Sequence, residues 1–306
     1  MIDGYRVVVC SPVGRRVTLE ILKVYMLKLQ GVVDEWRLWM NVKNMDDLEY
    51  INALAKEHPD YIKQTYKADR TDPEYGNFAV IKYFYEDCTD DNTIYVRIDD
   101  DVVFIDVDGF KRYLKFRVEN PEYFLVNPIV VNNSFVSWKL ASLGVLHDFP
   151  EYFDASENFK KYFSKISPEG FDLFDPNLRI THLVPVEAVL VDLYWKNPDF
   201  VRYIHSKFLD SPEVFKMPNW ELSNFEPVSI HCISWFGRDF KDIGSKVNAE
   251  EEPWLQTLYP FINGRKNIVF GDCVVSHYSY YSQVDALKGT NILDRYKVLA
   301  LKQAKI

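Results

Sequence analysis

The sequence is poor in cysteine and has no segment long and apolar enough for a membrane span. Its 306 residues include four cysteines, and no two of them form a CxxC pair, which disfavours a zinc knuckle or a disulfide framework. We therefore expect a reducing compartment. The first residues lack a signal-peptide pattern, and no apolar run approaches the roughly 20 residues that a spanning helix needs. These absences predict a soluble, cytoplasmic protein and leave peripheral membrane contact open.

Blocks of Lys or Arg are also missing. The formal net charge is −9 and the pI is near 5.3, so the chain has no basic stripe that could follow a phosphate backbone, and we expect no nucleic acid partner. It contains no GxGxxG, no GxSxG and no P-loop sequence, so nicotinamide chemistry, serine hydrolysis and P-loop phosphate binding lack local support.

What the chain has is enough apolar material for a large core, since 47% of its residues are hydrophobic and 16% are aromatic. Strand and helix patterns alternate over the first 120 residues, which predicts a mostly parallel sheet with helices on both faces and ligands beyond the strands' carboxyl ends. The alternation weakens afterwards. Strand patterns fall at residues 6–10, 35–40, 93–98, 123–131, 228–235 and 267–277, and helical patterns at 15–29, 46–57, 77–86, 185–208 and from 252; residues 150–177 show no clear period.

Three consecutive aspartates, Asp99, Asp100 and Asp101, follow the apolar run of residues 93–98 and precede another apolar run. Adjacent acids repel one another in a low-dielectric interior, so we expect them at the exposed end of a strand, with a cation to neutralise them. An Asp-x-Asp pair offers hard oxygen ligands that suit Mg²⁺ or Mn²⁺ and leave coordination positions for a diphosphate. A solvated turn between two strands is the alternative interpretation.

Among the six histidines, His277 differs from the others, which we interpret mostly as surface or core residues. It ends an apolar run and enters the aromatic stretch of residues 278–281. A neutral imidazole at a strand end can complete a metal shell or donate to a diphosphate oxygen. A structural role is the alternative.

Three acids at residues 250–252 precede Pro253 and Trp254 at a helix start. Their simplest role is stabilisation of the helix dipole. The more specific hypothesis is a catalytic base, because a carboxylate beside an apolar wall has a raised pKa and can take the proton of an acceptor hydroxyl. Trp254 and Trp235 would supply that wall and stack against an acceptor sugar.

In this order along the chain, these segments resemble the GT-A glycosyltransferases of the DxD type, and more narrowly a glycosyltransferase-like family. The resemblance covers most of the chain and is carried by residues 35–41, 95–101, 251–255 and 275–283. It implies an α/β fold with a Rossmann-like, mostly parallel sheet and an irregular acceptor side. Residues 1–306 would form a single domain, with a nucleotide-sugar-binding half at 1–120 and an acceptor-binding half at 121–306.

The resemblance also implies roles for particular residues. Asp99 and Asp101 would bind Mn²⁺ or Mg²⁺ on the donor diphosphate, with His277 completing the metal site. The inverting members carry a Glu-Asp pair whose second acid is the base; here the pair is Glu251-Glu252, which leaves the choice between Glu252 and Glu251 open. The candidates for nucleotide-sugar contacts are Ser11, Pro12, Val13, Arg15, Asn41, Asp69, Lys82, Asp99 and Asp100.

The sequence therefore predicts a metal-dependent glycosyltransferase. It would move a sugar from a nucleotide diphosphate sugar, with a uridine-linked donor favoured, to a hydroxyl of a glycan or another acceptor, with inversion. Two alternatives stay open. Asp106 and Asp108 stand in a DxDG sequence that imitates the haloacid-dehalogenase-like phosphohydrolases. The chain could also be a non-catalytic nucleotide- or carbohydrate-binding protein on the same fold.

Overall fold

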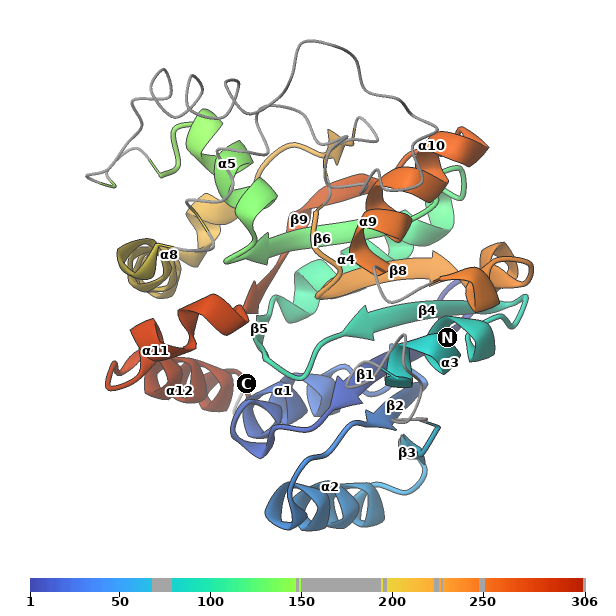
Figure 1. The fold of residues 1–306 in the computed structure, drawn as a ribbon, viewed down its shortest axis with the longest axis horizontal. Helices are drawn as coiled ribbons and strands as arrows, with labels where there is room; N and C mark the ends of the chain where they lie inside the picture. The colour runs from blue at the N-terminus through green and yellow to red at the C-terminus, as the bar shows by residue number, and fades with distance from the viewer. Residues whose placement is uncertain are drawn as a thin grey trace, which may run out of the picture.

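The computed structural model describes residues 1–67, 79–146, 149, 194, 197–222, 226, 228–247 and 251–304. Nine strands of this part of the chain form one sheet in the order β3-β2-β1-β4-β8-β6-β9-β5, and β7 pairs with β9 beside it (Figure 1). The strands are β1 (Arg6–Val13), β2 (Glu35–Met40), β3 (Ile62–Thr65), β4 (Thr93–Ile98), β5 (Val102–Ile105), β6 (Val126–Val131), β7 (Trp220–Glu221), β8 (Cys232–Phe236) and β9 (Ile268–His277).

The main body of the sheet is parallel. β1 pairs in parallel with β2 and β4, β2 with β3, and β6 with β9, whereas β8 runs antiparallel to both β4 and β6 and β5 runs antiparallel to β9. Parallel strands need helical crossovers, and these cover both faces of the sheet. The predicted α/β class, with a Rossmann-like and mostly parallel sheet, is confirmed.

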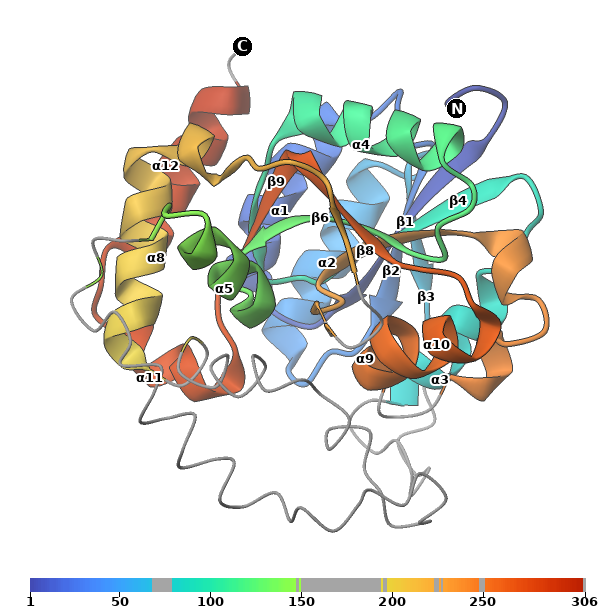
Figure 2. The same cartoon turned by 90° about the horizontal axis from the view of Figure 1, so that it is seen from above.

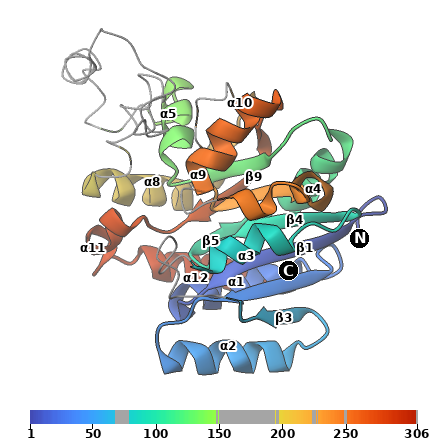
Figure 3. The same ribbon diagram turned by 45° about the vertical axis from the view of Figure 1, so that its right-hand side comes forward.

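Helices lie in layers on the two sides of the sheet. α1, α4 and α12 cover one face, and α3, α9 and α10 cover the other (Figure 2). α2 lies beside the edge strand β3 (Figure 3). The helices are α1 (Arg16–Lys28), α2 (Met45–Glu57), α3 (Ala79–Asp87), α4 (Val107–Glu119), α5 (Ser134–Ser142), α8 (Pro198–Asp210), α9 (Glu251–Pro253), α10 (Tyr259–Asn263), α11 (Val284–Leu287) and α12 (Ile292–Ala304).

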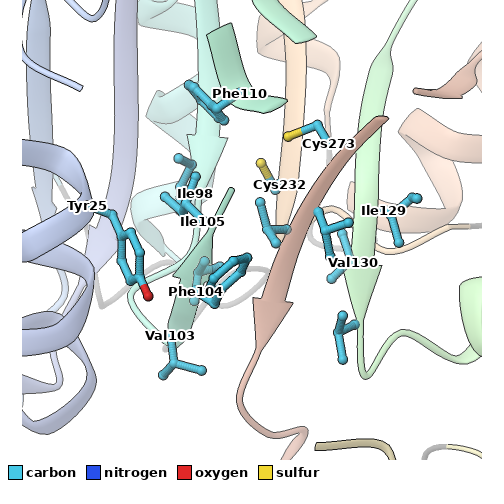
Figure 4. Close-up of a cluster of buried hydrophobic side chains, with 14 of the residues drawn as sticks. Tyr25, Ile98, Val103, Phe104, Ile105, Phe110, Ile129, Val130, Cys232 and Cys273 are labelled. Carbon is cyan, nitrogen blue, oxygen red and sulfur yellow. The ribbon is translucent and has the colours of Figure 1, made fainter. Parts of the chain in front are cut away.

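The period of two along β4 divides the core between the two faces. Ile94, Val96 and Ile98 join the larger apolar cluster, whereas Tyr95 joins the smaller cluster under α3 and α9. Figure 4 shows part of the larger cluster, where the Tyr25 ring of α1 meets Phe104 of β5 edge-on with ring centroids 5.7 Å apart. Arg97 follows the same alternation as Tyr95, so its side chain lies on the α3 and α9 face.

The predicted elements are confirmed where their pattern is strong, as at residues 35–40 and 93–98. The strand expected at residues 6–10 is longer in the structure, where β1 continues to Val13. Pro12 is tolerated because β4 pairs with β1 only as far as Cys10, so one side of β1 has no ladder partner at Pro12. The helix expected at residues 185–208 includes α8, which begins at Pro198; residues 150–177 and 185–193 lie outside the described part.

The helix expected from Glu252 is interrupted by a π-helical turn at Trp254–Leu258 between α9 and α10. Pro260 explains the interruption, because it lacks the N–H that would continue the α-helical bonds of the preceding turn. Gln256 holds the turn to the sheet by donating to the Asn127 side chain at 2.8 Å.

Candidate functional site

The candidate site lies at the edge where the parallel strands end. The carboxyl ends of β1, β2, β4, β6 and β9 meet there with the first residues of β5 and β8, as the strand registers require. Ligands of open α/β sheets bind beyond this edge. Gly14 and the following polar residues stand at the ends of these strands: Arg15, Asn41, Asp99, Asp100, Asp101, Asn132, Asn133, His231 and His277.

Backbone hydrogen bonds fix the acidic turn between β4 and β5. The Val102 N–H donates to the Asp99 carbonyl at 3.1 Å, which closes the turn. The Asp99 N–H donates to the carbonyl of His231 at 3.0 Å, and the Tyr278 N–H donates to the carbonyl of Asp101 at 2.8 Å. The segments that carry the two histidines therefore hold the three aspartates from both sides.

Asp100 connects the acidic turn to the start of α1. Its Oδ2 accepts from the Gly14 N–H at 2.7 Å and the Arg15 N–H at 2.9 Å, and its Oδ1 accepts from Arg15 Nε at 2.9 Å and from Arg15 Nη2. Gly14 is required here, since a Cβ atom at this position would lie 2.6 Å from the Asn41 carbonyl oxygen. Asp100 thus orients Arg15 rather than facing solvent; it is 3% exposed.

Asp101 lies between Arg15 and His277. Its Oδ2 is 3.0 Å from Arg15 Nη1 and 3.2 Å from His277 Nε2. Burial alone would raise the pKa of this carboxyl, but His277 and Arg15 outweigh burial and hold the pKa well below its usual range. Asp101 Oδ1 and His277 Nδ1 are buried without a hydrogen-bond partner among the described residues.

His231 is a site residue that the sequence reasoning missed. Its ring stacks on that of His277 with centroids 3.6 Å apart, and its Nδ1 bonds to Ser229 Oγ. Tyr280 closes the group, with its ring centroid 4.8 Å from that of His277. His231 stands directly before β8, and no local motif marks it; its position next to β4 appears only when β8 pairs there.

Arg97 joins the acidic turn to α9. Its Nε donates to Asp99 at 2.8 Å, and its Nη1 donates to Glu251 at 2.5 Å and to the Tyr85 hydroxyl at 3.1 Å. Arg97 and Glu251 are 6% and 7% exposed. Burial raises the pKa of Asp99 to about 6, although the Arg97 charge opposes that rise. Arg97 was not among the residues that the sequence singled out.

The two adjacent glutamates have different environments. Glu251 is committed to its ion pair with Arg97. Glu252 is partly buried, and burial together with repulsion from Glu251 raises its pKa to about 7. A carboxyl with a pKa near neutrality is suited to accept and release a proton at physiological pH. Of the two candidates for the base, Glu251 is the one that Arg97 engages.

Asp101 and His277 would offer two ligands to a divalent cation that takes its remaining ligands from elsewhere. Two ligands at roughly 2.1 Å on an octahedral cation lie about 3.0 Å apart, close to the 3.2 Å between Asp101 Oδ2 and His277 Nε2. The described residues contain no group of three or more His, Cys, Asp or Glu side chains arranged to hold a metal ion. Mg²⁺ and Mn²⁺ usually take their remaining ligands from substrate phosphates and water. The role predicted for Asp99 as a ligand is less favoured, since Arg97 holds one of its oxygens.

The other residues predicted to contact the nucleotide sugar lie in the sheet or its core, at the site edge, or outside the described residues. Ser11 is fully buried and accepts from the Trp36 indole at 3.1 Å, and Val13 is fully buried in the larger cluster. Asn41 lies at the site edge, where its backbone N–H donates to the Val13 carbonyl at 2.8 Å. Pro12 is a strand residue of β1. Asp69 and the side chain of Lys82 lie outside the described residues.

The two tryptophans also differ. Trp235 is fully buried, stacks on Tyr95 with centroids 5.9 Å apart and donates to the Cys88 carbonyl. The expectation that Trp235 lines an acceptor site is therefore corrected: its ring belongs to the core. Trp254 is partly buried and stacks on Tyr259 at 4.9 Å.

The DxDG sequence forms a helix start. The Asp106 side chain accepts from the Gly109 N–H at 3.0 Å as the N-cap of α4, and exposed Asp108 pairs with Lys111. β5 separates these residues from the acidic turn, so Asp106 lies at the far end of that strand. A helix cap accounts for this motif.

Similarity to known proteins is found among solved structures. No family model matches the chain, and no curated protein matches it. Among solved structures, CMP:2-keto-3-deoxy-manno-octonic acid synthetase complexed with CTP is similar over 98% of this chain and 100% of its own, with 9% identity and a TM-score of 0.43. The strand order itself identifies the Rossmann-like architecture. No helix in the described ranges is long and apolar enough to cross a membrane.

Proposed function

We propose that this protein is a glycosyltransferase that transfers a sugar from a nucleotide diphosphate sugar to a hydroxyl acceptor with inversion. The observation that carries the proposal is the meeting of two groups at one sheet edge. The acidic turn with Arg15 and His277 forms one, and Glu252, whose pKa is about 7, forms the other. The Arg97 ion pairs to Asp99 and Glu251 connect them.

The first group is suited to bind the donor diphosphate. Arg15 is oriented by Asp100, and its side chain is 56% exposed, so its guanidinium can approach a phosphate oxygen. Asp101 and His277 would hold Mn²⁺ or Mg²⁺, which when bound would neutralise charge on the leaving diphosphate. A uridine-linked donor is proposed from the sequence resemblance alone.

The second group is suited to activate the acceptor. Glu252 would take the proton of the acceptor hydroxyl as that oxygen attacks the anomeric carbon and the bond to the diphosphate breaks. Glu251 would not compete for this role, because Arg97 holds its carboxylate. Trp254, partly buried two residues later, would contact an acceptor sugar.

The test begins with a thermal-shift screen of nucleotides and sugar nucleotides, with and without Mn²⁺, because a ligand that binds only the folded state raises the melting temperature. Transfer to simple glycoside acceptors is then measured with the donor that binds. Asp101→Asn should lose Mn²⁺-dependent nucleotide binding. Glu252→Gln should retain that binding and lower transfer by about 10²- to 10⁴-fold.

Asp108→Asn is the matched control, since Asp108 is exposed and paired with Lys111; it should behave as the wild type. Phosphate release from simple monoesters that is lost in Asp106→Asn but kept in Asp101→Asn would instead identify a phosphohydrolase. Pyrophosphate release from a nucleoside triphosphate would identify nucleotidyl transfer. Nucleotide binding with neither hydrolysis nor transfer would identify a binding protein.

A further inference from the structure

Asp101 is the one acid of the turn that is contacted by both Arg15 and His277, and these two neighbours differ in freedom. His277 is 2% exposed and is stacked on His231 with centroids 3.6 Å apart, so its ring is fixed. The Arg15 side chain is 56% exposed, and its Nη1 lies 3.0 Å from Asp101 Oδ2. Asp100 holds Arg15 through its Nε and Nη2, so only the Nη1 contact to Asp101 has to break; of the two contacts on that oxygen, the one from Arg15 is the one that can be exchanged.

A divalent cation and the Arg15 guanidinium would both be attracted by the negative charge of Asp101. The Asp101 side chain is 6% exposed, so solvent screens its ion pair little. The described residues offer no third side chain that would complete a site around Asp101 and His277. A cation that binds without a diphosphate would therefore gain only two protein ligands, Asp101 and His277, and would have to displace the Arg15 guanidinium from Asp101.

We propose that Arg15 acts as a tethered substitute for the cation in the free protein. The inference rests on the proposed function, because it requires a diphosphate ligand. When a diphosphate arrives, its oxygens accept the Arg15 hydrogen bonds and Asp101 becomes free to bind the cation. Cation and diphosphate thus bind with positive coupling, and the protein takes up little metal without its donor.

This exchange has a thermodynamic signature. Coupling between two ligands is reciprocal and typically amounts to about 5- to 150-fold in affinity. Wild-type protein should bind Mn²⁺ alone weakly and bind it more tightly by a factor in that range when UDP is present. Removing the guanidinium should strengthen binding of Mn²⁺ alone and reduce the coupling, while weakening UDP binding through the lost phosphate contact.

The experiment is calorimetric titration of Mn²⁺ at buffered free-metal concentration, without ligand, with inorganic pyrophosphate and with UDP. Arg15→Gln should bind Mn²⁺ alone about 5-fold or more tightly than the wild type. Arg15→Lys keeps the charge but cannot reach both Asp100 and Asp101, so it should fall between the two. Arg16→Gln is the matched control, because Arg16 pairs with Glu20 at 2.7 Å; it should match the wild type.

Equal affinity for Mn²⁺ alone in the wild type, Arg15→Gln and Arg15→Lys would overturn the exchange. Tighter binding in Arg16→Gln as well would also overturn it, since the effect would then come from net charge. The proposed function fails separately: coupling with pyrophosphate but no binding of any sugar nucleotide would remove glycosyl transfer and leave the exchange standing.

Discussion

Glu252 carries a carboxyl group whose pKa burial raises from 4.5 to about 7, and the repulsion from Glu251 adds to this rise. Between these two values the folded state binds more protons than the unfolded state, so this group's stabilisation is lost as the pH rises through 7. Glu252→Gln keeps the neutral shape at every pH. We expect the variant to match the wild type near pH 4.5 and to be more stable at pH 8, by about 3 kcal/mol at most.

Urea denaturation at both pH values measures this difference, and transfer assays on the same samples should show the variant to be nearly inactive. A base with a pKa of about 7 also predicts that wild-type transfer rises with pH up to about pH 7 and then levels. Equal stability of the two proteins at pH 8 would show that the Glu252 carboxyl is not perturbed.

Arg97 is the residue whose loss should cost the most stability at the site. It is 6% exposed and neutralises both Asp99 and Glu251, so Arg97→Met leaves the buried Glu251 and the partly buried Asp99 without the cation that they share. Breaking a buried ion pair on one side typically costs about 3 to 5 kcal/mol. Arg6→Met is the control: Arg6 pairs with Glu35 at 2.6 Å but its side chain is 45% exposed, and it should lose about 1 kcal/mol or less. Similar losses in the two variants would contradict the burial argument.

At the scale of elements, strands and helices with a complete local pattern could be predicted from the sequence. The pattern of residues 35–40 and of residues 93–98 gave β2 and β4 with their observed bounds. The strand pattern of residues 6–10 stops before Pro12, whereas β1 continues through it, because the sequence does not say that β4 stops pairing before Pro12. The π-helical turn before Pro260 was missed for a similar reason, since Pro253 alone was read as a helix start.

The residues of the candidate site also divide into those that could be predicted from the sequence and those that could not. Asp99–Asp101 and His277 could be found because each ends an apolar strand pattern, and Glu252 because acids cluster at a helix start. Arg97 could not, since its partner Glu251 lies 154 positions away in the sequence. His231 could not either, since its position depends on the pairing of β8 with β4. Trp235 was misassigned because aromatic residues mark cores as often as sugar-binding walls, and only packing separates the two.

His205 connects α8, α12 and the end of β9 behind the site. Its Nε2 lies 2.8 Å from the Tyr278 carbonyl and its Nδ1 lies 2.9 Å from the Tyr296 hydroxyl, which also bonds to Ser276. A neutral ring that donates from Nε2 and accepts at Nδ1 satisfies both partners. Burial lowers the pKa of His205 from 6.5 to about 4.

Between pH 6.5 and 4, His205 therefore binds a proton in the unfolded chain but not in the folded protein. The free energy of unfolding falls as the pH falls through this range. The loss should reach about 3 kcal/mol at most. His205→Gln should be less stable than the wild type at pH 7. Its free energy of unfolding, measured by urea denaturation at pH 7 and pH 4.5, should lack this part of the pH dependence. His58→Gln, at the partly exposed end of α2, should keep it. An unchanged difference in His205→Gln would mean that the ring is not held neutral.

At the scale of the whole molecule, the two halves of the chain are interleaved in one sheet. β4 and β5 are neighbours in sequence, yet β8, β6 and β9 lie between them, and all three come from residues after 120. The acidic turn between β4 and β5 is likewise held by backbone bonds from His231 and Tyr278. A fragment of residues 1–120 would leave one edge of β4 unpaired and β5 without any partner strand, which exposes apolar surface and unsatisfied backbone groups.

We therefore predict that residues 1–120 expressed alone do not fold, although they contain the predicted nucleotide-sugar-binding half. The fragment should show no cooperative transition in urea by circular dichroism and no protection of β4 amides from hydrogen exchange. Co-expression with residues 121–306 should restore both, because Trp235 of β8 can then stack on Tyr95 of β4. The intact chain should unfold with coincident changes in tryptophan fluorescence and circular dichroism. A cooperative transition of the isolated fragment would instead mean that the first half is a domain by itself, with the second half added to it rather than inserted between its strands.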